Sequence, residues 1–215
     1  MINLKTILFE KKDTTKKEKI LYTSFEEKDI KTDGSAYLKN GNIILTDDYH
    51  QTAKATIKPT IDLEDRSWKA DIVFQIDGSE GVSDAEGKGA DGISMAIGGD
   101  DKLVVNFDTF KNLENDSGNE IVLRVENAVV EKKYVRRKMN DGKKHHFRIH
   151  YNNPEQVITI HEFISKEKKI PILSYAFSEY PLSELLKGDL HISFSSFTGD
   201  AMAIHKILKF SIGYV

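Results

Sequence analysis

Short stretches in which apolar and polar residues alternate, each ended by turn-forming residues, account for most of this chain. Alternation with a period of two is typical of a strand that buries one face, whereas the spacing of an amphipathic helix is nearly absent. The candidate strands are residues 19–23, 36–39, 42–46, 68–76, 92–97, 102–108, 120–127, 146–151, 157–163, 170–177, 190–197 and 203–213. Many short strands without an internal repeat predict an all-β sandwich of two antiparallel sheets.

Turn and helix signals fit the same architecture. Asn40 and Gly41 lie between two candidate strands, and both residue types accept the positive φ of a tight hairpin turn. Residues 152–154 (NNP) take a corresponding place between two alternating segments. Helical character is confined to residues 181–187 (PLSELLK), with Gly188 in the position that follows the last turn.

The composition describes one large, well-solvated domain. A length of 215 residues is normal for a large β-sandwich, and an apolar content of 39% can build one sizeable core. The net charge of −3 gives no general attraction to nucleic acid. The basic run 11–19 also contains acidic residues, so a solvated arm is favoured over a nucleic-acid contact. We expect residues 1–18 to form an N-terminal arm and residues 19–215 to form the sandwich domain.

Cysteine is absent, which excludes disulfides, thiolate metal sites and a cysteine nucleophile. The first residues (MINLKTILFEKKD) become charged too early to form a secretory signal. No apolar stretch approaches the length of a membrane span, so we expect no membrane insertion.

The loop after residues 102–108 concentrates oxygen-bearing side chains. Asp108, Asn112 and Asp116 recur every fourth residue, and Ca²⁺ prefers several hard oxygen ligands of this kind. The same loop carries an amide and the ring of Phe110, groups that bind the hydroxyls and the face of a sugar. We interpret the loop as a calcium-braced carbohydrate site. Residues 77–89 (DGSEGVSDAEGKG) are polar and glycine-rich, which predicts a solvated loop more than a source of further cation ligands.

The order of several motifs resembles the L-type (legume-type) lectin family, in a bacterial or phage-like form given the Lys-, Asn- and Ile-rich usage, over residues 22–214. The ADGI segment at residues 90–93 and the NFDTF segment within residues 105–121 resemble the family's two signature motifs. The other similar segments are 34–46 (GSAYLKNGNIILT), 68–76 (WKADIVFQI), 142–151 (GKKHHFRIHY) and 190–210, which ends in SFSSFTGDAMAIHKILKF. The resemblance implies a concanavalin A-like jelly-roll β-sandwich with a flat back sheet and a curved front sheet.

The resemblance also implies a shallow sugar site built from loops at one end of the front sheet. Asp91 would accept hydrogen bonds from two sugar hydroxyls, after a cis peptide bond with Ala90. Asn112 would donate its amide to the same hydroxyls, and Phe110 would offer its ring to a sugar face. The remaining implied contacts are the backbone N–H of Gly98 or Gly99, and the specificity loop at Gly199 and Asp200.

The calcium shell implied by the resemblance consists of Asp108, the backbone carbonyl of Phe110, Asn112 and Asp116. Glu114 is an alternative to Asp116 if the loop is aligned differently.

The family's second metal site departs from its pattern here. Asn106 stands where the family has Glu, and Glu120 stands where it has His. A neutral amide and a hard oxygen disfavour Mn²⁺ or zinc. The second site is then empty or holds another calcium or magnesium ion.

A catalytic role is disfavoured by the same segment. Glycosidases of this fold resemble E-x-D-x-x-E on one strand, because glycoside hydrolysis needs two carboxyl groups across the sugar. Here Asn106 and Lys111 stand at the two outer positions beside Asp108. We therefore expect no enzymatic activity.

The leading hypothesis is a calcium-dependent carbohydrate-binding domain that recognises cell-surface glycans as an adhesin or targeting module. Such a role places it outside a cell or on a cell or virion surface, and the back sheet would allow a homo-oligomer. The alternative is a structural or protein-docking sandwich whose sugar site has decayed, which the altered second metal site favours.

Overall fold

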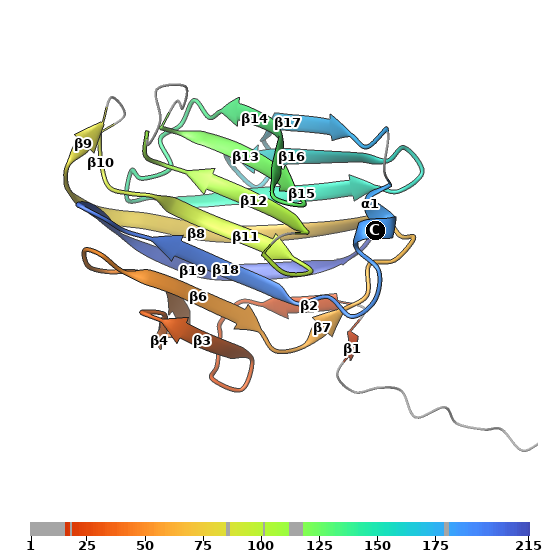
Figure 1. The fold of residues 1–215 in the computed structure, drawn as a ribbon, viewed down its shortest axis with the longest axis horizontal. Coiled ribbons are helices and arrows are strands. Elements are labelled where there is room, and N and C mark those ends of the chain that lie inside the picture. Colours follow the sequence, from red (N-terminus) through yellow and green to blue (C-terminus); the bar gives the residue numbers. More distant parts are fainter. Residues whose placement is uncertain (1–15, 18, 85–86, 101, 112–117, 179–180) are drawn as a thin grey trace, which may run out of the picture.

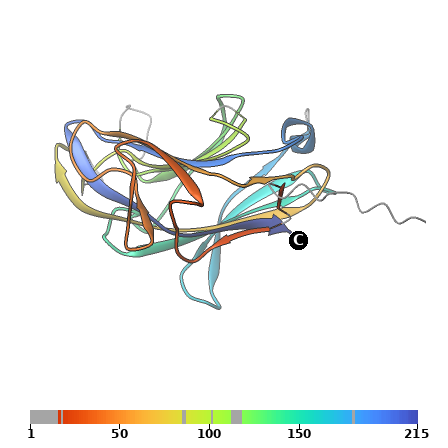
Figure 2. The ribbon, with the colours of Figure 1, turned by 90° about the horizontal axis from the view of Figure 1, so that it is seen from below.

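The computed structural model describes residues 16–17, 19–84, 87–100, 102–111, 118–178 and 181–215. In this part of the chain, two large antiparallel sheets pack face to face, and one short helix lies at an end of the sandwich (Figure 1; Figure 2). The predicted all-β sandwich is confirmed. None of the described helical residues form a segment long and apolar enough to cross a membrane.

The back sheet has two long strands at its centre. Its strands, in spatial order, are β17 (Lys169–Ala176), β16 (Val157–Phe163), β15 (Lys144–Asn152), β8 (Trp68–Gly81), β19 (Ala201–Tyr214), β5 (Asn42–Ile44) and β4 (Tyr37–Lys39), and β2 (Lys19–Tyr22) also pairs with β19. Burial alternates along β15, where Phe147 and Ile149 face the core while His146 and Arg148 lie on the other face.

The front sheet carries the predicted binding residues. Its strands, in spatial order, are β14 (Ala128–Tyr134), β13 (Glu120–Val125), β12 (Leu103–Asp108), β11 (Gly92–Ile97), β18 (Ile192–Phe197), β6 (Thr52–Ile57) and β3 (Ile30–Gly34). Ile93 and Met95 of β11 belong to the core, so the intervening Ser94 lies on the outer face of the sheet.

Two pairs of short strands and one helix complete the described chain. The strand β1 (Lys16–Lys17) pairs with β7 (Thr60–Ile61), and β9 (Ser83–Asp84) pairs with β10 (Gly87–Lys88). The helix α1 (Leu182–Leu185) is a single turn, shorter than the predicted helical segment.

The predicted loop at residues 77–89 is wrong, because β8 extends into it and the short pair β9 and β10 lies within it. Strand β8 continues to Gly81, and its ladder with β19 includes the pairs Asp77–Ile204 and Gly81–Ala201. The polar composition hid this extension, because backbone pairing with a neighbouring strand does not require apolar side chains.

An aromatic cluster joins the two sheets at the centre of the core. The ring centroids of Phe74 in β8 and Phe107 in β12 are 5.0 Å apart, and Phe147 in β15 is 5.0 Å from Phe107. All three side chains are fully buried. Aromatic pairs at such distances add to the stabilisation from buried area, so this cluster fixes the front sheet over the back sheet.

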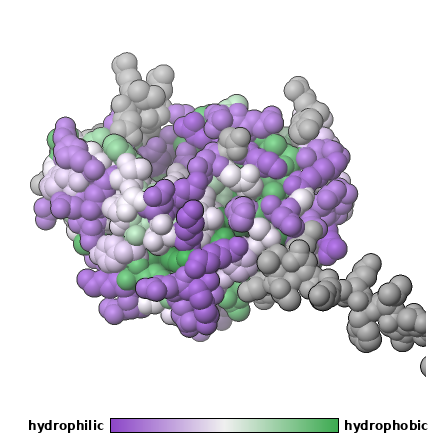
Figure 3. Space-filling model, turned by 60° about the horizontal axis from the view of Figure 1, so that its bottom comes forward, coloured by the Kyte–Doolittle hydropathy of each residue, from purple (hydrophilic) through white to green (hydrophobic). Residues whose placement is uncertain are grey.

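The surface in Figure 3 is mainly hydrophilic, with hydrophobic residues in separate patches.

Candidate functional site

Asp91 and Asp108, the predicted sugar-binding carboxylate and the first predicted metal ligand, meet where β11 and β12 lie side by side. The two strands pair antiparallel, so Gly92 at the start of β11 lies opposite Asp108 at the end of β12. The backbones approach so closely that a Cβ at residue 92 would lie 2.1 Å from the carbonyl oxygen of Phe107. Glycine is therefore required at this position, and the residue before it, Asp91, is brought to the end of β12.

Backbone hydrogen bonds hold Asp91 between two strand ends. The peptide bond between Ala90 and Asp91 is cis, as the resemblance implies. The Asp91 N–H donates to the carbonyl oxygen of Phe197 in β18 at 2.9 Å, and the Asp91 carbonyl oxygen accepts from the Thr109 N–H at 3.2 Å. This clamp fixes the backbone from which the predicted sugar-binding carboxylate projects.

A hollow of about 280 Å³ lies on the outer face of the front sheet next to this clamp. Four adjacent strands, β6, β18, β11 and β12, form its floor. The side chains that carry its chemistry are Asp91, Ser94, Asn106, Asp108, Ser195 and Phe197. Carboxylate, amide and hydroxyl groups beside one aromatic ring suit a neutral polar ligand that also has an apolar face.

Asp108 begins the predicted metal loop. Its Oδ1 accepts a hydrogen bond from the backbone N–H of Phe110 at 3.0 Å, which turns the chain at the end of β12. Asp108 and Phe110 therefore fit the start of an oxygen-rich calcium shell. The other predicted ligands, Asn112 and Asp116, and the alternative ligand Glu114, lie outside the described residues. Within the described ranges, no three His, Cys, Asp or Glu side chains are grouped so that they could hold a metal ion.

The residues predicted for a second metal site do not fit a transition metal. Glu120 in β13 lies opposite Asp108, and its side chain is only 5% exposed. The Nζ of Lys132, on the neighbouring strand β14, lies 3.6 Å from Glu120 Oε1. An ammonium group at this distance would repel a divalent cation bound to the same carboxylate. Asn106, on β12, adds only a neutral oxygen.

The two glycines after β11 lie away from Asp91. Both have positive φ, 81° at Gly98 and 112° at Gly99. The Gly98 N–H donates to the carbonyl oxygen of His191 at 2.9 Å, which extends the pairing of β11 with β18. Both glycines follow the end of β11, whereas Asp91 precedes its start, so about 20 Å of strand separates them from Asp91. The structure therefore does not bring the predicted backbone donor of Gly98 or Gly99 to a sugar bound at Asp91.

The predicted specificity loop is tied to two other segments. The Gly199 carbonyl oxygen accepts from the His50 N–H at 3.3 Å, and the Asp200 carbonyl oxygen accepts from the Val82 N–H at 3.1 Å. The Asp200 side chain is 81% exposed and lies 3.4 Å from the His50 ring. Its position leaves this carboxylate accessible to a ligand at the end of β18.

Phe197 is a site residue that sequence reasoning missed. Its side chain is 50% exposed and lines the hollow, although phenylalanine is usually buried. The signal was present in the alternation of β18, where Phe194 and Ser196 are buried and Ser195 and Phe197 are on the outer face.

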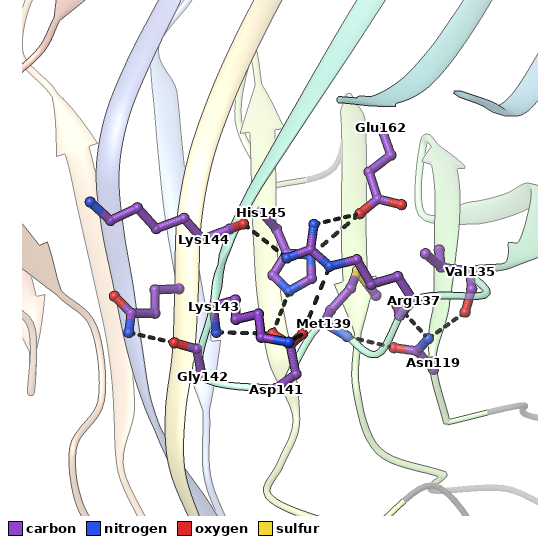
Figure 4. Close-up of polar contacts among 11 residues, drawn as sticks. Asn119, Val135, Arg137, Met139, Asp141, Gly142, Lys143, Lys144, His145 and Glu162 are labelled. Atoms are coloured by element: carbon purple, nitrogen blue, oxygen red, sulfur yellow. Dashed lines mark hydrogen bonds and ion pairs between the residues drawn. The ribbon is translucent and has the colours of Figure 1, made fainter. Parts of the chain in front are cut away.

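A buried amide anchors the chain where the metal loop rejoins the front sheet (Figure 4). Asn119, directly before β13, is 1% exposed. Its Nδ2 donates to the carbonyl oxygens of Val135 and Arg137, and its Oδ1 accepts from the Met139 N–H at 3.1 Å. The residue that precedes β13 is thus fixed by three hydrogen bonds.

The histidine beside this anchor is part of a charge network and not of a metal site (Figure 4). His145 is fully buried, with Nε2 2.9 Å from Asp141 Oδ1 and Nδ1 3.5 Å from Glu162 Oε1. Arg137 lies within 3.7 Å of both carboxylates. Burial opposes ionisation of Asp141, but hydrogen bonds from His145 and from the Lys143 N–H leave its pKa lowered. The two ring nitrogens of His145 face different carboxylates, so His145, Asp141 and Glu162 do not converge on a position where one metal ion could bind.

Comparison with known proteins finds one matching family model and many solved structures of similar fold. The family model described as the legume lectin domain matches residues 96–214. The lectin from Bauhinia forficata in complex with GalNAc superimposes with a TM-score of 0.74 at 19% identity, over 92% of this chain and 97% of that chain. No curated protein sequence matches the chain.

Two further solved structures agree. The winged bean acidic lectin complexed with methyl-α-D-galactose has a TM-score of 0.74 at 20% identity, over 90% of this chain and 96% of that chain. The metal-free form of lectin I-B4 from Griffonia simplicifolia has a TM-score of 0.73 at 16% identity, over 91% and 98%. At such low identity, these likenesses establish the jelly-roll fold.

Proposed function

The chain belongs to the legume lectin domain family, a family of carbohydrate-binding domains, and we propose that it binds sugar beside Asp91. The observation that carries this proposal is the clamp that holds the Asp91 backbone at the edge of the hollow. A carboxylate held in this way accepts hydrogen bonds from two neighbouring hydroxyls, each worth about 1.5–3 kcal/mol because the acceptor is charged.

The other contacts in the proposed site come from loops around Asp91. Asn112 donates its side-chain amide, and Phe110 packs its ring against a sugar face. Gly199 and Asp200 set which sugar fits. A shallow site with few hydrogen bonds gives a dissociation constant of about 0.1–1 mM for one sugar, so useful avidity requires several sites on one particle.

Calcium completes the proposed site. Asp108, the Phe110 carbonyl oxygen, Asn112 and Asp116 would hold the ion, which supplies positive charge that orders the loop next to Asp91. Asp108 is already turned into this loop by its hydrogen bond with the Phe110 N–H.

We infer one cation per chain. Glu120 stands where the family's second ion takes a ligand, and the Lys132 ammonium lies beside it. This positive charge opposes the binding of a second cation there.

The proposed activity is binding without catalysis, because Asn106 and Lys111 replace the two outer carboxylates of the glycosidase pattern. The proposed ligands are glycans on cell surfaces, and the proposed setting is outside a cell or on a virion. Pairing through the back sheet would give the multivalency that a weak site requires.

A second candidate is a protein-docking sandwich that no longer binds sugar. The Glu120–Lys132 ion pair favours it, because it removes part of the family's metal machinery. The Asp91 clamp favours the lectin, because a docking role gives no reason to keep it.

A glycan array in calcium, repeated in EDTA, separates the two. The lectin predicts binding to a defined set of glycans that EDTA abolishes and that Asp91→Ala lacks. Binding in calcium that persists in EDTA would refute the calcium role. A wild-type protein that binds no glycan in calcium would leave the docking role.

A further inference from the structure

We propose that the hollow extends the carbohydrate site and holds a second sugar residue against the ring of Phe197, so that the protein recognises a neutral oligosaccharide. The inference rests on the proposed function, because Asp91 binds the first sugar. The carbonyl oxygen of Phe197 accepts the Asp91 N–H at 2.9 Å, so the aromatic residue lies directly beside the first sugar's main acceptor.

The ring of Phe197 has a fixed base and a free face. Its backbone pairs with Thr52 in β6 on one side and bonds to Asp91 on the other. The preceding residue is also fixed, because the Ser196 hydroxyl donates to the Gly92 carbonyl oxygen at 2.7 Å. Half of the Phe197 side chain remains exposed. A rigid aromatic surface binds a ligand at a small entropic cost.

The hollow of about 280 Å³ connects this ring with the predicted binding carboxylate, because both Phe197 and Asp91 line it. Gly92 between them packs its backbone against β12, and its carbonyl oxygen accepts the hydrogen bond from Ser196 in β18.

A row of polar side chains lines the floor of the hollow. In the ladders of the front sheet, Ser94 lies opposite both Asn106 and Ser195, so two hydroxyls and one amide follow each other across three strands. All three line the hollow. These groups can both donate and accept hydrogen bonds, as sugar hydroxyls do.

The mixture of groups selects the ligand class. A purely apolar ligand would cover the hydroxyls of Ser94 and Ser195 without bonding to them, which is unfavourable. An anionic ligand would meet the carboxylate of Asp91. A neutral sugar satisfies both constraints, because its C–H face can cover the Phe197 ring while its hydroxyls bond to the polar row.

The test compares variants on an array of neutral monosaccharides, disaccharides and longer oligosaccharides in calcium. The wild type is expected to bind an oligosaccharide about tenfold more tightly than its terminal monosaccharide, which corresponds to covering part of one aromatic ring. Phe197→Ser should bring the two affinities together while monosaccharide binding persists. Phe197→Tyr should keep the oligosaccharide preference. Val129→Ser, at an equally exposed position of β14 in the same sheet, serves as the control.

Each outcome decides the inference. Equal affinity of the wild type for monosaccharide and oligosaccharide would overturn it and leave the proposed function intact. An unchanged oligosaccharide preference in Phe197→Ser would also overturn it. Loss of all glycan binding in Phe197→Ser, at an unchanged melting temperature, would place Phe197 in the first subsite and overturn it as well. A wild type that binds no glycan would overturn the proposed function itself, and the second subsite with it.

Discussion

Replacing His205 is expected to remove much of the protein's acid sensitivity. His205 lies in β19 at the centre of the back sheet and is fully buried. Its Nδ1 lies 2.6 Å from the Thr46 hydroxyl oxygen, which is also buried. Desolvation by burial lowers the pKa of His205 from 6.5 to about 3. The folded protein therefore keeps this imidazole neutral over most of the acidic range.

The direction and size of the effect follow from linkage. Between pH 6.5 and pH 3 the unfolded chain binds a proton at this residue and the folded chain does not, so stability falls as the pH falls. Each pH unit in this window costs about 1.4 kcal/mol, which gives about 2 kcal/mol at pH 5 and about 5 kcal/mol below pH 3.

The measurement is urea unfolding of the wild type and His205→Gln at pH 7 and pH 5, in EDTA so that calcium affinity does not contribute. The wild type should lose about 2 kcal/mol more than the variant between the two pH values. Burial and nearby cations also lower the pKa of His150 and His161, but both proteins share these groups. His191→Gln, at an exposed position, should behave as the wild type does. Parallel pH profiles for the wild type and His205→Gln would refute the reasoning.

Four other variants test the site and the core. Asp91→Ala should abolish glycan binding and leave the melting temperature in calcium unchanged, whereas Asp108→Ala should lower both, because calcium stabilises only the folded state that binds it; an array and thermal melts with and without calcium check this. Glu120→His combined with Lys132→Ala should create Mn²⁺ binding that the wild type lacks, measured by electron paramagnetic resonance, and Mn²⁺ binding by the wild type would contradict it. Phe107→Ala should lower the unfolding free energy by about 3–5 kcal/mol in denaturant titrations, since its ring joins the two sheets; a loss below about 1 kcal/mol would show that the cluster is not central.

The fold class could be predicted from the sequence because most strands alternate strongly enough to be recognised. Three strands of the front sheet escaped for physical reasons. Strand β6 (TAKATI) buries only alanines on much of its inner face, so its alternation is weak in hydrophobicity. Strand β14 is an edge strand with an exposed or half-exposed pattern, and most of β3 is exposed. Their pairing depends on backbone hydrogen bonds to neighbouring strands, which composition does not encode.

The position of Asp91 beside Asp108 could be predicted only through the resemblance. No local pattern links the two residues, and the antiparallel register of β11 with β12 is what brings them together. The resemblance of the ADGI and NFDTF segments to the family's signature motifs implied that the two residues belong to one site. The role proposed for Phe197 lay outside the motifs. An aromatic residue in a strand is normally assigned to the core, although the alternation within β18 places Phe197 on the outer face.

The site and the core are therefore separable in this molecule. The core needs only apolar residues of suitable size at alternate positions, a condition met at 15–20% identity to solved lectins of the same fold. The proposed ligand contacts lie at strand ends and on the outer face of the front sheet. A substitution at an exposed residue there, such as Phe197, removes few packing contacts from the core. We expect substitutions there to change the size of the recognised glycan while the aromatic cluster keeps the two sheets in place. Phe197→Ser should therefore alter glycan binding with little loss of unfolding free energy, whereas Phe107→Ala should lower the unfolding free energy and leave the glycan preference unchanged. Denaturant titration and the glycan array, applied to both variants, would decide this.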